Sequence, residues 1–447
     1  MVAAAIAAAL TFKVTPSAAL EIKRETLSNG AILLVSSQNA LPMVTMAIGF
    51  DAGARRDPPG KPGLASLTAS CLTLGTKDLS EEDFDRKVDF MGSTVSVDAS
   101  EDFAEAGMTS LKRYEHDTLA LLASQLQAPA LRDEDILRKR AEIVAGIESA
   151  QQDPGYVAEV AFRKLLFGDQ PYGHPPEGTA DSVSHLTPDD VRKFYHQYYR
   201  LGSAVIAVVG DVDDDQIKAE LEHDLPGPTG TVAPQTPPPP PVVAPGIHVT
   251  VINRDVAQAN LILGAAGIAR ANPDYYRFQV MDYILGEGGF ASRLMKVVRS
   301  KAGLAYSISS GAEAGEFTGS FRVVLETKNE SANQALNLIF GQLKEIRDKP
   351  VADQELSSAK KFLIGSFPLN LDRQSSIADY LLTLQLYNLG LDYTERYPAR
   401  IDAVTKDDVQ QVARKYIHPD AMILVAVTDK DQAKIDADAL QKAASGN

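Results

Sequence analysis

The side chains that most often bind metal ions are sparse in this sequence of 447 residues, which contains seven histidines and one cysteine. The histidines are His116, His174, His185, His196, His223, His248 and His418. The closest two are eleven positions apart, whereas a zinc-binding helix presents two imidazoles within one helical turn. The sequence therefore excludes an H-x-x-x-H zinc helix. The single cysteine excludes an intrachain disulfide and a thiolate-rich metal site.

A second group of polar side chains lies between Ser292 and Tyr306. Ser292 is a suitable N-cap for a short helix, and Gly303 is suited to end that helix. This spacing predicts that Arg299 lies in the last turn and Tyr306 at the start of the next strand. Spacing alone leaves two interpretations open. Arg299 compensates the helix C-terminus while Tyr306 packs in the core, or the two side chains form a functional pair.

Residues 63–76 predict a helix with one apolar side and one hydroxyl-bearing side. The apolar positions are Leu64, Leu67, Cys71 and Leu74. Their spacing is helical, and Ser66 and Ser70 fall one turn apart on the other side. Because Cys71 lies on the apolar side and the chain has no G-x-S-x-G motif, the sequence argues against a serine or cysteine hydrolase.

This predicted helix resembles the zinc helix of the M16 peptidases, the pitrilysin and mitochondrial-processing-peptidase group, which follows the pattern G-L-A-H-x-x-E-H-x-x-x-x-G-T. The resemblance places Ser66 and Ser70 at the two zinc histidines, and Ala69 at the general-base glutamate. It also places Gly146, in a helix predicted over 133–149, at or beside a further glutamate ligand. None of these side chains is a good zinc ligand. The resemblance therefore implies that this chain binds no zinc, with no other cofactor expected.

The resemblance covers nearly the whole chain. Residues 166–179 follow the family pattern L-F-x-x-x-P-Y-G-H-x-x-x-G-T, and residues 299–306 resemble the R/Y pair in the C-terminal half of M16 enzymes. In that family the two side chains reach toward zinc bound by the other half, and they donate hydrogen bonds to the substrate carbonyl and the developing oxyanion. The resemblance thus favours a functional pair, Arg299 and Tyr306.

The elements that must position these residues occur twice. Residues 186–209 match residues 404–427 at a constant offset of 218, and each copy has a threonine N-cap, an aspartate in the first helical turn and an apolar run of strand length. Further strand-like runs lie at 31–36, 44–50, 93–99, 248–252, 260–265 and 320–326. The sequence predicts an α+β fold of two homologous M16-type halves, each a mainly antiparallel sheet with helices packed on one face.

Composition sets the domain boundaries. Residues 226–246 hold nine of the 25 prolines and predict a stiff linker that keeps the two halves apart. The N-terminal half then spans 20–225 and the C-terminal half 247–447. Residues 1–19 contain an apolar run followed by small residues, which favours an export signal and a periplasmic protein. No Lys or Arg precedes the run, so a cytoplasmic location is the alternative.

Charge narrows the range of partners. The chain has 44 Lys and Arg residues against 59 Asp and Glu residues, a net charge of -15. This balance argues against a nucleic acid or an anionic membrane surface as the main partner. No apolar stretch long enough to span a bilayer follows the N-terminal run, so we predict no transmembrane helix.

Together these features predict the non-zinc subunit of a heteromeric M16B peptidase. We expect a homologous partner subunit carrying H-x-x-E-H to supply zinc and the general base, while this chain supplies Arg299 and Tyr306 for the hydrolysis of unfolded peptides. The chain would then be inactive alone. The alternatives are a catalytically inert scaffold and a homodimeric peptide-binding homologue without hydrolysis.

Overall fold

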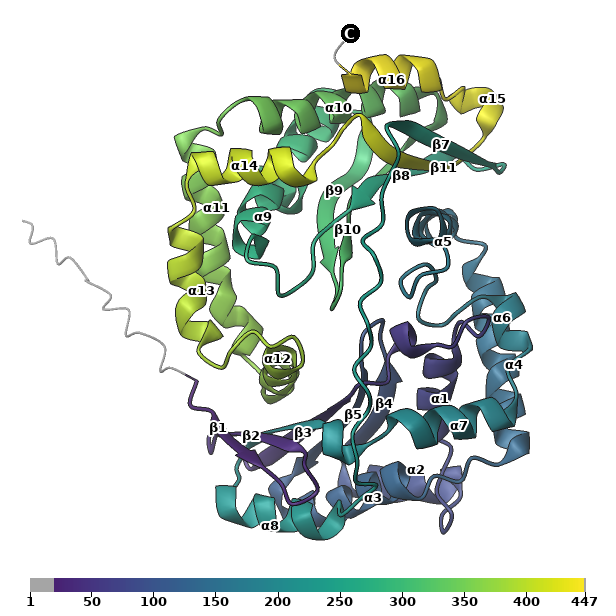
Figure 1. Cartoon of the computed structure of the whole chain (residues 1–447), viewed down its shortest axis with the longest axis vertical. Coiled ribbons are helices and arrows are strands. Elements are labelled where there is room, and N and C mark those ends of the chain that lie inside the picture. Colours follow the sequence, from purple (N-terminus) through teal and green to yellow (C-terminus); the bar gives the residue numbers. More distant parts are fainter. Residues whose placement is uncertain (1–19, 446–447) are drawn as a thin grey trace, which may run out of the picture.

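Residues 20–445, the part described by this computed structural model, form two mixed sheets, one in each half of the chain (Figure 1). The N-terminal strands are β1 (Lys23–Thr26), β2 (Ile32–Ser37), β3 (Met43–Phe50), β4 (Thr94–Ala99), β5 (Ala104–Leu111) and β6 (Val205–Gly210). The C-terminal strands are β7 (Gly246–Asn253), β8 (Gln258–Ala266), β9 (Ala305–Ala314), β10 (Gly319–Lys328) and β11 (Ala421–Thr428). The predicted export segment, residues 1–19, lies outside the described residues.

The two sheets have the same topology. The first runs β1-β2-β6-β3-β5-β4 and the second β7-β11-β8-β10-β9. In each sheet one pair is parallel, β2 with β6 and β7 with β11, and the other pairs are antiparallel. Apart from the extra strand β1, corresponding strands occupy corresponding places. The predicted α+β fold of two homologous halves is therefore confirmed.

Helices of the same half, other than α5 and α12, cover one face of each sheet. The N-terminal helices are α1 (Leu64–Leu72), α2 (Glu81–Met91), α3 (Glu115–Gln127), α4 (Asp133–Ala150), α5 (Pro154–Phe167), α6 (Ala180–Ser184), α7 (Pro188–Tyr198) and α8 (Asp214–Asp224). The C-terminal helices are α9 (Tyr275–Asp282), α10 (Ala332–Asp348), α11 (Asp353–Ser366), α12 (Gln374–Leu386), α13 (Tyr393–Asp402), α14 (Lys406–Tyr416), α15 (Lys430–Ala433) and α16 (Ala437–Ser445). Among residues 20–445, no helix combines the length and the apolar character needed to cross a bilayer.

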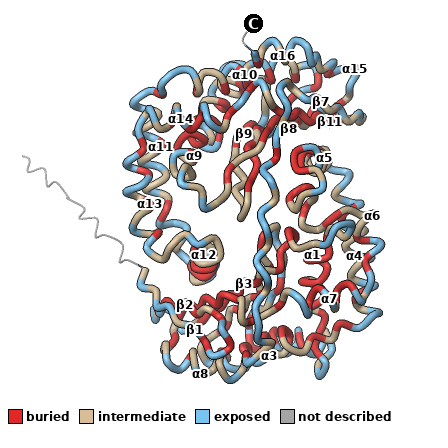
Figure 2. Tube along the Cα trace, viewed as in Figure 1, coloured by how far each residue is buried: buried red, intermediate tan, exposed pale blue. Residues whose placement is uncertain are grey.

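The second face of each sheet is covered by a helix from the other half. Helix α12 of the C-terminal half packs Ile377 and Leu381 against β2, β3 and β6, in a cluster that includes Val209. Helix α5 of the N-terminal half packs Phe162 against β8 and β11, in a cluster that includes Val425. Figure 2 shows buried residues on both helices where they lie between the halves. The two helices hold equivalent places in the repeat, so this packing is a reciprocal exchange.

The proline-rich segment does not keep the halves apart, so that part of the prediction is wrong. Residues 225–245 contain no helix or strand, and they run from the N-terminal half to β7 in the C-terminal half (Figure 1). The Val232 N–H donates to Ser203 Oγ at 2.7 Å, and the Ala233 carbonyl accepts from the Arg56 guanidinium at 3.0 Å. The segment is therefore a strap that binds to the N-terminal half, where its backbone forms hydrogen bonds. The halves themselves pack directly against each other, because this removes their apolar faces from water.

The two copies of the repeat also share a helix cap, as the sequence predicts. Thr187 Oγ1 accepts the Asp190 N–H at 3.3 Å, and Thr405 Oγ1 accepts the Asp408 N–H at 3.1 Å. In both copies the aspartate carboxylate accepts the threonine N–H in return, which completes a capping box.

Thr187→Ala and Thr405→Ala are each expected to lower the free energy of unfolding by about 1 kcal/mol, because each removes an N-cap hydroxyl. Urea unfolding of the two variants measures this loss. Thr383→Ala is a matched control, since within residues 20–445 its hydroxyl bonds only the Asp379 carbonyl of its own helix. Equal stability of Thr405→Ala and Thr383→Ala would contradict the prediction.

Candidate functional site

The positions that correspond to the family's zinc ligands lie on α1 and α4, which pack against each other. Asp57 fixes the start of α1, because its carboxylate accepts the N–H groups of Gly63 and Ala65, both at 2.7 Å. Ser66 and Ser70 are half-buried and lie one turn apart, whereas Ala69 is buried in the core. The apolar side of α1 packs as predicted.

These side chains do not fit a zinc ion. Gly146 has no side chain and is exposed on α4, while its neighbour Ile147 is buried in the core of the N-terminal half. Within the described ranges, no three His, Cys, Asp or Glu side chains lie close enough together to hold a metal ion. Burial raises the pKa of the Cys71 thiol to about 12, so this sulfur does not supply a thiolate near neutral pH.

Arg299 lies in a π-helical turn, Met295–Lys301, that leads into β9. Ser292 Oγ accepts the Met295 N–H at 3.3 Å and thereby caps the turn, as predicted. The Ala302 N–H donates to the Val297 carbonyl at 3.2 Å, which widens the last turn. Gly303 then adopts a φ of 66°, a left-handed conformation that favours glycine and ends the turn. Such π turns often occur at functional sites.

The Arg299 guanidinium lies between two aromatic rings. Its central carbon is 5.0 Å from the centroid of the Phe290 ring and 5.5 Å from that of the Tyr306 ring. Both rings are largely exposed, Phe290 by 70% and Tyr306 by 74%. Tyr306 is therefore not a core residue, and the interpretation that places it in the core is wrong. The two rings hold Arg299 through cation–π contacts.

Arg299 has no carboxylate partner among residues 20–445. Its only polar side-chain contact there is to Met295 Sδ, 3.9 Å from a terminal guanidinium nitrogen. The Tyr306 hydroxyl also has no hydrogen-bond partner in this part of the chain. By contrast, the nearby Arg293 donates two hydrogen bonds to Glu355, at 2.7 and 2.8 Å. Arg299 and Tyr306 thus carry a cation and a hydroxyl that no oxygen or nitrogen atom of residues 20–445 pairs.

The structure brings Arg299 and Tyr306 together, and it places them in the other half of the chain from Ser66 and Ser70. Helix α1 lies in the N-terminal half, whereas β9 and the π turn belong to the C-terminal half (Figure 1). No hydrogen bond or ion pair joins these two groups within the described residues.

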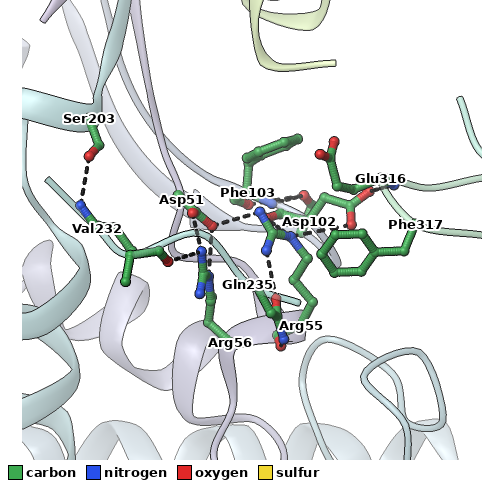
Figure 3. A network of polar contacts seen from close by, with 12 residues as sticks. Asp51, Arg55, Arg56, Asp102, Phe103, Ser203, Val232, Gln235, Glu316 and Phe317 are labelled. Atoms are coloured by element: carbon green, nitrogen blue, oxygen red, sulfur yellow. Dashed lines mark hydrogen bonds and ion pairs between the residues drawn. The ribbon is translucent and has the colours of Figure 1, made fainter. Parts of the chain in front are cut away.

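A buried carboxylate, Asp102, connects the two halves (Figure 3). One of its oxygens accepts from Tyr172 Oη at 2.6 Å. The other accepts from Tyr387 Oη at 2.9 Å and from the Glu316 N–H at 2.9 Å. Tyr387 and Glu316 belong to the C-terminal half, so Asp102 bonds both halves at one point.

Arg55 extends this junction to the strap. It donates to the Asp102 carbonyl at 3.1 Å and to Gln235 Oε1 at 2.7 Å, and the Gln235 amide donates back to the Arg55 carbonyl at 2.9 Å. Its guanidinium also lies over the rings of Phe103, at 5.4 Å, and Phe317, at 5.2 Å. The junction therefore joins the N-terminal half, the strap and the C-terminal half (Figure 3).

Two carboxylates face each other where β5 meets α12. Glu105 of β5 and Asp379 of α12 line a cavity of about 430 Å³ between the halves, together with Asp98. Burial, followed by repulsion from Asp379, raises the pKa of Glu105 to about 7. Burial also raises the pKa of Asp379. The folded protein therefore favours a protonated carboxyl at this point.

Stability is expected to fall as the pH rises from about 4.5 to about 7, because over this range the folded protein keeps a proton on Glu105 that the unfolded chain has lost. Glu105→Gln cannot ionise, so at pH 8 it should exceed the wild type by roughly 1 to 2 kcal/mol in free energy of unfolding, with little difference near pH 4. Urea unfolding across this pH range measures the effect. The exposed Glu134→Gln is the control, and parallel pH profiles for both variants and the wild type would contradict the assignment.

Sequence reasoning missed Phe290, Asp102 and Arg55. Phe290 follows a glycine-rich stretch, and an isolated aromatic residue there carries no periodic signal. Asp102 and Arg55 act through partners that are distant in the chain, Tyr387 and Gln235 among them. Single sequences hold no local signal for contacts of this kind.

The sequence and the fold of this chain are similar to those of known proteins. Residues 33–179 match the insulinase family, also called peptidase family M16, and residues 185–363 match the peptidase M16 inactive domain. These two adjacent matches together cover more than half of the chain. The chain therefore belongs to peptidase family M16, as the resemblance implies.

Similar proteins carry different descriptions. The chain is 26% identical to an uncharacterized zinc protease of Streptomyces coelicolor, over 93% of this chain and 92% of that protein. It is 25% identical to a non-peptidase homolog of Helicobacter pylori, over 90% of this chain and 93% of that protein. A crystal structure of a peptidase M16 inactive domain from Pseudomonas fluorescens is 28% identical, with a TM-score of 0.85 and coverage of 92% and 98%. This chain is thus a family member of the inactive type.

Proposed function

We propose that this chain is the non-zinc subunit of a heteromeric M16 peptidase and that it completes the active site of a homologous partner carrying H-x-x-E-H. The observation that carries this proposal is the state of Arg299. A guanidinium that has no carboxylate partner among the described residues, and that two exposed aromatic rings hold in place, is suited to receive an anionic or polar group from another molecule.

The chemistry of the pair suits peptide hydrolysis. When a peptide carbonyl is attacked, its oxygen gains negative charge, and hydrogen-bond donors that are already in place stabilise that charge. Arg299 offers a charged donor and Tyr306 a hydroxyl donor, both from one turn and the strand that follows it. Neither residue replaces a metal or a general base. The zinc ion and the base are assigned to the partner, because Ser66, Ala69, Ser70 and Gly146 cannot supply them.

An extended peptide is the substrate class that the fold favours. Strands β4 and β9 each form the edge of a sheet, where backbone N–H and C=O groups are free to pair with another strand. Strand β9 begins one residue before Tyr306, so a peptide added along this edge would pass the Arg299–Tyr306 pair. Backbone pairing of this kind accepts many side chains. We also propose a periplasmic location, on the basis of the composition of residues 1–19.

Purification of the tagged chain from its native cells tests the proposal. We expect an M16 homologue with H-x-x-E-H to co-purify, zinc to be stoichiometric in the complex and absent from the isolated chain, and an unfolded peptide to be cleaved only when both chains are mixed. Stoichiometric zinc in the isolated chain would contradict the proposal. A partner that is fully active by itself would instead support the scaffold alternative, which accords with the non-peptidase description of the Helicobacter pylori homolog.

A further inference from the structure

A small cavity in the C-terminal half is lined by arginines. It has a volume of about 220 Å³ and lies between the loop that leads from β8 into α9 and the segment that leads from α12 into α13. Its lining includes Arg270, Arg396 and Arg400, the amides Asn272 and Asn388, and three tyrosines, but no carboxylate. Three cationic side chains around one cavity are unexpected in a protein with a net charge of -15.

The positive charge of this cavity is only partly neutralised. Within residues 20–445, Arg270 and Arg400 form no ion pair, and Arg270 bonds only the Tyr393 hydroxyl, at 3.2 Å, through its side chain. Arg396 pairs with Asp392 at 2.8 Å and donates to the Leu389 carbonyl at 2.7 Å. The Nε atom of Arg396 is nevertheless buried without a hydrogen-bond partner. Buried donors without a partner are rare in folded proteins, so the residues around the Arg396 guanidinium do not satisfy it completely.

Two of the three arginines, Arg270 and Arg396, are held by neighbouring residues. The Arg270 guanidinium carbon lies 4.1 Å from the centroid of the Tyr275 ring and 5.3 Å from that of Tyr393. Tyr393 stacks in turn on Tyr276, with ring centroids 5.8 Å apart. Gly390 has a φ of 85°, and a Cβ atom at this position would lie 2.7 Å from the Arg396 guanidinium. A larger residue at this position would strain the loop and displace the Arg396 guanidinium.

We propose that this cavity binds an oxyanion, the carboxylate or phosphate group of a small ligand. A guanidinium matches such a group with paired, charge-assisted hydrogen bonds. Asn272 adds a further donor, because its oxygen accepts the Asp274 N–H at 2.9 Å and its amide nitrogen is left available. Neutral ligands and cations are disfavoured, since the lining has cations and no carboxylate. This assignment does not rest on the proposed pairing with a zinc subunit.

The cavity lies next to the junction of the two halves. The Arg270 N–H donates to the Gly315 carbonyl at 2.8 Å, directly before Glu316, which bonds Asp102. On the other wall, Asn388 directly follows Tyr387, the second residue of the C-terminal half that bonds Asp102. An anion in the cavity would therefore order both segments that reach Asp102. Ligand binding should raise the thermal stability of the whole chain.

Calorimetric titration of the full-length protein with inorganic phosphate, at constant ionic strength, tests the proposal. We expect saturable binding of one anion per chain and a rise in melting temperature. A second titration with N-acetylglycine distinguishes a carboxylate ligand from a phosphate ligand, and the tighter of the two identifies the source. Arg400→Gln, which changes an exposed side chain, should weaken the binding of that anion by about tenfold or more, in line with the loss of one charge-assisted hydrogen bond.

Arg113→Gln is the matched control, because Arg113 is also exposed, lies over a tyrosine ring and forms no ion pair within the described chain. Its affinity for the anion should equal that of the wild type. The absence of saturable binding with both anions would overturn the proposal. Equal affinities of Arg400→Gln and Arg113→Gln would also overturn it, since binding would then reflect general surface charge.

Discussion

Asp102→Ala is expected to lower the free energy of unfolding by roughly 3 to 5 kcal/mol, the range found when one partner of a buried charged network is removed. The side chain is only 3% exposed and accepts hydrogen bonds from Tyr172, Tyr387 and the Glu316 N–H. Alanine leaves the buried Tyr172 hydroxyl and two part-buried donors without this acceptor. Because two of the donors belong to the C-terminal half, the loss weakens the attachment of the halves as well as the fold of the N-terminal half.

Urea unfolding, followed separately by far-UV circular dichroism and tyrosine fluorescence, measures this effect. We expect a lower midpoint for Asp102→Ala and transitions that no longer coincide, because the halves become less strongly coupled. Asp169→Ala is the control, since Asp169 is almost fully exposed and, in the described part of the chain, pairs only with Lys164. If the stability of Asp102→Ala lay within 0.5 kcal/mol of this control, a typical limit for surface substitutions, the role of Asp102 as a junction residue would be wrong.

Arg299→Ala and Tyr306→Phe should each reduce kcat of the mixed complex by about 100- to 1,000-fold, the usual effect of removing one donor to a developing oxyanion. KM should change little, because the donors act mainly in the transition state. Tyr306→Phe removes a single hydroxyl from a side chain that is 74% exposed, so it should leave folding unaffected. Initial rates of peptide cleavage by the complex measure both constants.

Arg113 and Tyr114 provide a matched control for this pair. Their side chains also make a cation–π contact, with 4.8 Å between the guanidinium carbon and the ring centroid, but they lie in the N-terminal half. Arg113→Ala and Tyr114→Phe should leave kcat unchanged. Full activity of a complex that carries Arg299→Ala and Tyr306→Phe together would remove the basis of the proposed function.

The repeated pattern allowed much of the fold to be predicted from the sequence. Residues 186–209 form α7 and β6, and the matching residues 404–427 form α14 and β11. The predicted threonine caps are present in both copies. The helix over 133–149 was predicted to within one residue. Strand β5, Ala104–Leu111, was missed because it consists largely of small and polar residues, and its pairing with β3 and β4 overrides their weak strand propensity.

The candidate site was predictable only where its residues are close in sequence. The positions of Arg299 and Tyr306 followed from one turn and the strand after it, and the structure places them there. The exchange of α5 and α12 was not predicted, because the apolar side of a helix shows that a partner exists but not which sheet provides it. The number of prolines predicted a spacer that keeps the halves apart. Proline lacks a backbone N–H, but the strap binds through the backbone groups of other residues, Val232 and Ala233, so prolines are compatible with it.

The exchange of α5 and α12 makes the two halves depend on each other for a complete core. If the strap were cut, each half would still need the helix of the other to cover its sheet, so the arrangement is that of a domain-swapped dimer of one repeat unit. Because the strap links the two halves covalently, their association is intramolecular. Its effective concentration does not fall when the protein is diluted. Because the halves are one polypeptide, each can carry different side chains at equivalent positions, as the Arg299–Tyr306 turn of the C-terminal half shows.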